Sequence, residues 1–226
     1  MTGFLLFWAI TRMPARQVGF ARGDKSSWAI ALSYPFAVVA VLVGVAQASG
    51  AVHPEDLNTA TLLKNVAFNS TVGIIGVLLV EEGFFRGWLW GQLERSGLSP
   101  FAILMWTSIS FALWHLPVVF IEPSYAQTGN VIPVYLVNAV LMGMIWGMLR
   151  AMSGSIWVAC AAHAVWNSLA YALFGYGVKA GKLGIQSFDI FGPERGVAGL
   201  LINLLVVIAL WYVWQARNRL EPAISH

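Results

Sequence analysis

Long apolar runs, separated by short polar or turn-forming stretches, cover most of this chain. Each run has roughly the 17 to 25 residues that a helix needs to cross a bilayer. The pattern predicts about six membrane-spanning helices, near residues 28–48, 64–93, 101–121, 131–149, 155–174 and 197–214. The run from Phe4 to Ile10 is shorter and lacks the flanks of a signal peptide, so we expect an interfacial helix there. The expected fold is an all-α polytopic membrane bundle, with one domain over residues 1–226.

Composition supports the same class. Of the 226 residues, 58% are hydrophobic and only 10% are charged, and the mean hydropathy of +0.72 lies outside the range of soluble domains. The net charge of +3 comes from scattered basic residues without a basic stripe, which argues against a nucleic-acid partner. The single cysteine, Cys160, excludes an intramolecular disulfide and a cysteine-rich metal cluster.

The basic residues predict the orientation of the helices. Cytoplasmic loops of membrane proteins are enriched in Lys and Arg. In the six-helix arrangement, one side carries more of them: Arg12, Arg16, Arg22, Lys25, Arg95, Arg150, Arg217 and Arg219, against Lys64, Lys179, Lys182 and Arg195. We therefore expect an integral plasma (inner) membrane protein with both termini in the cytoplasm.

Two adjacent carboxylates and an arginine lie at the end of the second apolar run. Ionisable groups at membrane depth usually face a protein interior or a water-filled cavity and indicate a functional site. Alternatively, the run ends at residue 80 and the charges meet lipid headgroups. Glu82 and Arg86 are four residues apart, so in a helix they can form an ion pair. Glu81 is rotated from Glu82 by roughly 100° and is free to be reactive.

Polar residues on the third and fifth predicted helices complete a candidate site. His115 follows Phe111 by four residues, and Asn167 follows His163 by four, so each pair shares one helix face. A lone histidine in an apolar helix is more often a core residue than a catalyst. Whether each histidine is a core residue or a catalyst therefore depends on the polar groups of the neighbouring helices.

A hairpin between the second and third helices would bring these groups together. Glu81, Glu82 and His115 are at similar sequence distances from a turn near Gly97. At about 1.5 Å per residue, they lie within a few Å of the same depth. Glu81, alone or with His115, could then deprotonate a water that attacks a peptide carbonyl.

The remaining groups would support that reaction. His163 and Asn167 would donate hydrogen bonds to the oxyanion, while Glu82 and Arg86 keep Glu81 oriented. A version with a divalent metal such as zinc, bound by Glu81, His115 and His163, is also open, because one carboxylate and two imidazoles form a catalytic zinc set. No His-Glu-x-x-His motif favours the metal version.

These residues carry a family resemblance. The segments Glu81-Glu82-Gly83-Phe84-Phe85-Arg86, Phe111-Ala112-Leu113-Trp114-His115 and His163-Ala164-Val165-Trp166-Asn167 resemble the EExxxR, FxxxH and HxxxN/D motifs of the CPBP family of intramembrane proteases. That family includes type II CAAX prenyl endopeptidases and Abi proteins of bacteriocin processing and immunity. The resemblance covers a motif core of residues 80–167. It implies a glutamate-dependent or metal-assisted endopeptidase with Glu81, His115, His163 and Asn167 at its centre and Glu82 and Arg86 beside them.

Two functions are compatible with this pattern. The first is hydrolysis of a peptide bond in a membrane-associated or lipidated peptide. The second is a non-catalytic Abi-type role, such as bacteriocin immunity or peptide binding. A binding protein does not need a general base at the same membrane depth as oxyanion donors. The presence of Glu81 and His115 together with His163 and Asn167 therefore favours the enzyme.

Overall fold

The computed structural model describes residues 3–54, 58–121, 131–176, 179–185 and 187–220. Regular structure in these ranges is almost entirely helical. The helices are α1 (Gly3–Thr11), α2 (Ala15–Val18), α3 (Lys25–Ala48), α4 (Thr59–Val77), η1 (Leu78–Leu89), α5 (Trp90–Arg95), α6 (Pro100–Trp114), α7 (Leu116–Ile121), α9 (Val131–Ser153), α10 (Ile156–Leu173), α11 (Phe188–Phe191) and α12 (Val197–Leu220). Two short strands, β1 (Gly175–Tyr176) and β2 (Lys179–Ala180), pair antiparallel after α10.

Six segments of the described chain are long and apolar enough to span a membrane. They are Lys25–Ala48, Thr59–Arg95, Pro100–Ile121, Val131–Ser153, Ile156–Leu173 and Val197–Arg219. They match the six predicted helices, although the first and second begin earlier and the sixth ends later than expected. The predicted all-α polytopic membrane bundle is therefore confirmed.

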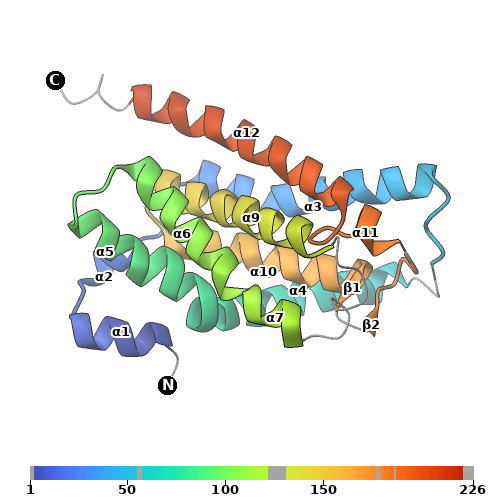
Figure 1. Ribbon diagram of the computed structural model, residues 1–226, viewed down its shortest axis with the longest axis horizontal. Helices are drawn as coiled ribbons and strands as arrows, with labels where there is room; N and C mark the ends of the chain where they lie inside the picture. Colours follow the sequence, from blue (N-terminus) through green and yellow to red (C-terminus); the bar gives the residue numbers. More distant parts are fainter. Residues whose placement is uncertain (1–2, 55–57, 122–130, 177–178, 186, 221–226) are drawn as a thin grey trace.

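Helix α10 forms the centre of the bundle. It contacts α3, α4, α9 and η1, and 72% of its span is buried, against 22% for Thr59–Arg95. Figure 1 shows α10 between these helices, with α12 along the outer side of α9. Side chains of α10 therefore face protein on most sides, whereas α4 presents large apolar residues such as Phe68 and Val72 outward, as expected for a lipid-facing surface.

The turn near Gly97 joins the second and third spans as an antiparallel hairpin. Gly97 has φ +74°, a left-handed conformation that glycine adopts without strain. Helix α6 then begins at Pro100, whose missing N–H is no loss in the first turn, and the Ser99 hydroxyl caps the N–H of Ala102 at 3.3 Å. This confirms the hairpin that the depth argument assumed.

Candidate active site

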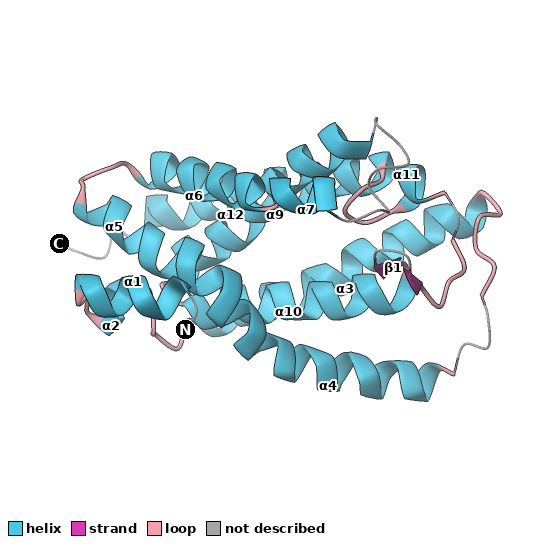
Figure 2. Cartoon of the chain, turned by 60° about the horizontal axis from the view of Figure 1, so that its bottom comes forward, coloured by secondary structure: helices cyan, strands magenta, loops and turns pink. Residues whose placement is uncertain are grey.

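The two adjacent glutamates lie in a π-helix. Helix η1 continues α4 without a break, and Figure 2 shows the helix running on beyond α4. A π-helix turns less per residue than an α-helix because its hydrogen bonds run from i to i+5. Neighbouring side chains therefore point in more similar directions. The sequence predicted an ordinary helix here, and the wider turn helps Glu81 and Glu82 to reach the same imidazole ring.

Glu82 and Arg86 form the predicted ion pair. Nη1 of Arg86 donates to Oε1 of Glu82 at 3.1 Å, and both side chains are fully buried. Nη2 of Arg86 donates to the carbonyl of Gly143 at 2.9 Å, and the guanidinium lies 4.5 Å from the centroid of the Phe111 ring. Charges removed from water need such partners. The pair is thus held rigidly between η1 and α9.

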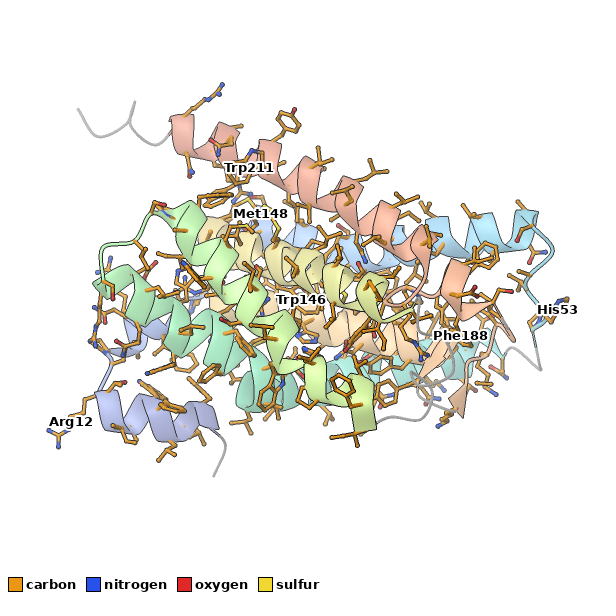
Figure 3. The ribbon with its side chains drawn as sticks, in the orientation of Figure 1. Arg12, His53, Trp146, Met148, Phe188 and Trp211 are labelled. Atoms are coloured by element: carbon orange, nitrogen blue, oxygen red, sulfur yellow. The ribbon has the colours of Figure 1, made fainter. Side chains whose placement is uncertain are left out.

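Glu82 also orients His163, a contact that the sequence did not reveal. Nδ1 of His163 lies 2.9 Å from Oε1 of Glu82. Because Arg86 favours the carboxylate form of Glu82, Nδ1 is the hydrogen-bond donor. The ring stacks on Trp146, with 3.7 Å between centroids, and Figure 3 labels Trp146 at the middle of the bundle. In the neutral imidazole, Nε2 therefore carries a lone pair.

His115 lies at a break in the third span. Helix α6 ends at Trp114 and α7 begins at Leu116, because Pro117 has no N–H to continue the ladder. The backbone N–H of His115 bonds to Ala112, which leaves the carbonyl of Phe111 to accept from Nδ1 of His115 at 2.9 Å. A carbonyl only accepts, so this bond also places the lone pair of the neutral ring on Nε2.

Both Nε2 atoms face one oxygen of Glu81. Oε2 of Glu81 lies 3.8 Å from Nε2 of His115 and 3.7 Å from Nε2 of His163. This oxygen is buried and accepts no hydrogen bond from any described residue. Three acceptors, from η1, from α10 and from the break between α6 and α7, thus converge on one point. This arrangement is suited to binding a small proton donor such as water.

The three groups line a cavity of about 320 Å³ together with Asn167. A second cavity, of about 630 Å³, lies against the first, and Asn167, Tyr171 and Tyr176 line both. All six residues that the sequence singled out are therefore close together. Glu81, His115, His163 and Asn167 line the first cavity, and Glu82 and Arg86 are buried behind it.

Two other residues belong to this region and were missed from the sequence. Glu194, in the loop before α12, lines the first cavity, and its pKa is raised by burial, which outweighs the hydrogen bond from Trp166. Arg150 was counted above only among the basic residues of the cytoplasmic side. It is 5% exposed and donates to the backbone carbonyl of Arg86 at 3.1 Å. No motif marks either residue, because each acts through a contact distant in sequence.

The donor types at the cavity suit a divalent metal, but their spacing does not. Two ligands of one tetrahedral zinc, each about 2.0–2.1 Å from the ion, would be about 3.4 Å apart. The two Nε2 atoms are 3.7 and 3.8 Å from Glu81. Across the described ranges, no group of three or more His, Cys, Asp or Glu side chains is arranged to hold a metal ion. The predicted metal set is therefore not assembled as a coordination site.

Comparison with known proteins supports the family resemblance. Residues 63–169 match the model of the Rce1-like family, described as type II CAAX prenyl endopeptidase Rce1-like. The matched segment includes η1, α6 and α10 up to Asn167, and so contains all three motifs. No curated protein and no solved structure matches the chain. The match over residues 63–169 of this integral multi-pass membrane protein therefore supports its resemblance to the CPBP family of intramembrane proteases, which includes the type II CAAX prenyl endopeptidases.

Proposed function

We propose that this protein hydrolyses a peptide bond of a membrane-associated or lipidated peptide, using a water molecule activated by Glu81 and His115. The observation that carries the proposal is the convergence of Glu81 Oε2 with the Nε2 atoms of His115 and His163, at 3.8 and 3.7 Å, on one cavity. The adjoining cavity of about 630 Å³ gives an extended peptide room beyond the reaction centre.

The reaction needs only the residues around this cavity. A water between Glu81 and His115 gives a proton to Glu81 as its oxygen attacks the peptide carbonyl. The oxyanion accepts a hydrogen bond from the Asn167 amide, and from Nε2 of His163 when that ring is doubly protonated and balanced by Glu82. The C–N bond then breaks, and Glu81 returns the proton to the leaving amine. No step depends on a metal.

The Rce1-like match supports a protease but leaves the substrate open. The proposal therefore names a membrane-associated peptide and not a prenylated one. We further propose that the protein lies in the plasma membrane with both termini in the cytoplasm, as the distribution of Lys and Arg predicts. Its partners would be the bilayer and the peptide substrate.

The decisive experiment uses the purified protein in detergent with a panel of membrane peptides. We expect Glu81→Gln and His115→Ala to lower kcat by at least about a hundredfold, because general bases contribute about 10²–10⁴-fold. Thermal unfolding of both variants should match wild type. Cleavage by Glu81→Gln at the wild-type rate would show the catalytic assignment to be wrong and favour the non-catalytic, peptide-binding alternative.

A parallel arm adds a chelator to the wild-type protein. We expect the cleavage rate to be unchanged, because the donor spacing does not form a metal site. Loss of activity that zinc restores would contradict the metal-free mechanism.

A further inference from the structure

We propose that Glu194 determines specificity by binding a positively charged side chain of the peptide, next to the scissile bond. This inference rests on the proposed function, since it assigns a substrate feature to the same cavity. Glu194 lies outside the segment that matches the Rce1-like family.

The loop that carries Glu194 is held in place by buried amides. Nδ2 of Asn138, on α9, donates to the carbonyls of Pro193 and Glu194 at 2.9 and 3.0 Å. Nδ2 of Asn203, on α12, donates to Oδ1 of Asn138 at 2.9 Å, and both asparagines are fully buried. Buried amides of this kind are retained only when they are hydrogen-bonded. The backbone of the loop at Glu194 is therefore fixed by helices α9 and α12.

The side chain of Glu194 points to the reaction centre. Nε1 of Trp166 donates to its Oε1 at 3.1 Å, and Trp166 precedes Asn167 on α10. Glu194 lines the cavity together with Glu81, His115 and His163. Its carboxyl thus lines the same cavity as the proposed oxyanion donor, Asn167, where it can contact a residue near the attacked carbonyl.

The charges that line the first cavity favour a cation, whereas Lys179 and Lys182 line the adjoining one. Two carboxyl groups, those of Glu81 and Glu194, line it, and no described lining residue is a Lys or Arg. Arg86 is behind the wall and pairs with Glu82. Arg195, the next residue after Glu194, interacts electrostatically with the Glu194 carboxyl but does not line this cavity. Its guanidinium lies 5.4 Å from the ring centroid of Phe188, on α11.

Aromatic rings on the cavity wall support the same chemistry. Trp114, Tyr171 and Tyr176 line the cavity and are 55, 38 and 50% exposed. Aromatic faces attract ammonium and guanidinium groups, most strongly where water is excluded. A purely apolar substrate group would match these rings but would bring no positive charge to the two carboxyls. Carboxyls and rings together therefore favour a Lys or Arg side chain.

The test measures peptide binding to the full-length Glu81→Gln protein in detergent, so that no cleavage is required. The probes are fluorescent, N-acetylated membrane peptides in which Lys replaces norleucine at each position in turn. We expect Lys at one position to tighten binding roughly tenfold, as for a charged hydrogen bond. An unblocked norleucine peptide distinguishes a side-chain ammonium from a terminal amine.

The informative variant is Glu194→Gln in the same background. Glutamine keeps an acceptor for Trp166 but removes the charge, so we expect the preference for Lys to fall to about twofold or less while unfolding is unchanged. Glu94→Gln is the matched control. Oε1 of Glu94 also accepts from a tryptophan, Nε1 of Trp90 at 2.8 Å, but Glu94 is on α5 and does not line the cavity.

The proposal fails if no position prefers Lys, if norleucine or Glu peptides bind more tightly, or if Glu194→Gln keeps the full preference. Cleavage separates this result from the proposed function. If the Lys preference depends on Glu194 but wild type cleaves no peptide, the hydrolase assignment fails and the cation site stands. With a cleaved Lys peptide, Glu194→Gln should raise KM about tenfold and leave kcat within about twofold.

Discussion

His163 contacts both glutamates, one through each ring nitrogen. Glu82 is fully buried and paired with Arg86, and it receives Nδ1 at 2.9 Å. Glu81 is 20% exposed, lines the cavity and faces Nε2 at 3.7 Å. A carboxylate with fixed partners is suited to holding a ring in place, whereas one at a cavity is suited to proton transfer. The two adjacent acids are thus distinguished by their partners and not by residue type.

The buried Glu82–Arg86 ion pair should contribute more to stability than an exposed arginine does. We expect Arg86→Met to destabilise the protein by about 3–5 kcal/mol, because it leaves the Glu82 charge buried and uncompensated. The double variant Glu82→Gln with Arg86→Met should recover part of that loss. Thermal unfolding in detergent measures both. Arg95→Met, which removes an exposed arginine on α5, is the control and should cost about 0.5 kcal/mol or less. A double variant less stable than Arg86→Met would contradict this account.

Helix η1 sets the directions of the reactive side chains. Its π-helical turns depend on a residue without a side chain at position 83, because a Cβ there would collide with the carbonyl of Leu78 and lie 2.6 Å from the ring of Phe4 on α1. The α1 helix therefore packs directly behind the paired glutamates. The apolar pattern predicted a helix through this stretch, but a π-helical segment of 12 residues within one long apolar span gives no separate periodic signal.

Gly83→Ala should therefore disturb the site through the backbone. We expect a loss of about 1–3 kcal/mol from overpacking, with reduced cleavage as Glu81 and Glu82 shift. Gly76→Ala on α4 is the matched control, since nothing lies within 4 Å of a Cβ there, and better helix propensity should leave it neutral or slightly stabilised. Unfolding temperature and kcat/KM are the measurements. Equal behaviour of the two variants would refute the requirement for glycine at position 83.

The bundle brings together groups from four separate parts of the chain. Helix α10 at the centre carries His163 and Asn167, η1 carries Glu81, the end of α6 carries His115, and the loop before α12 carries Glu194. Contacts between distant segments hold these elements in place, such as Asn138 with the Pro193 carbonyl and Arg150 with the Arg86 carbonyl. The site is therefore a property of the packing of six spans rather than of one motif.

The orientation of the protein in the membrane can be tested by labelling cysteines placed in loops on opposite sides of the bundle. We expect Ser96→Cys to be on the cytoplasmic side and Lys182→Cys on the opposite side, because Lys and Arg are concentrated at the former. Both parent residues are exposed. An impermeant maleimide applied to intact cells should label Lys182→Cys, and Ser96→Cys only after permeabilisation. The unmodified chain is the control, because its Cys160 is fully buried. The reverse pattern would invert the topology.

Apolar periodicity and charge placement were sufficient to predict the six spans, the hairpin at Gly97 and the Glu82–Arg86 pair. Each follows from local physics: bilayer thickness, the conformational freedom of glycine, and the i to i+4 spacing of a helix. The predicted hairpin and the four-residue spacings also led us to group Glu81, His115, His163 and Asn167 as one candidate site.

The proton positions on both histidines, the division of roles between the glutamates, and the presence of Glu194 in the cavity depend on contacts that only packing creates. Nδ1 of His163 meets Glu82 across 81 residues of sequence, and Glu194 is held by asparagines on two other helices. Such long-range contacts leave no periodic signal along the chain, because they connect residues through the arrangement of helices in space.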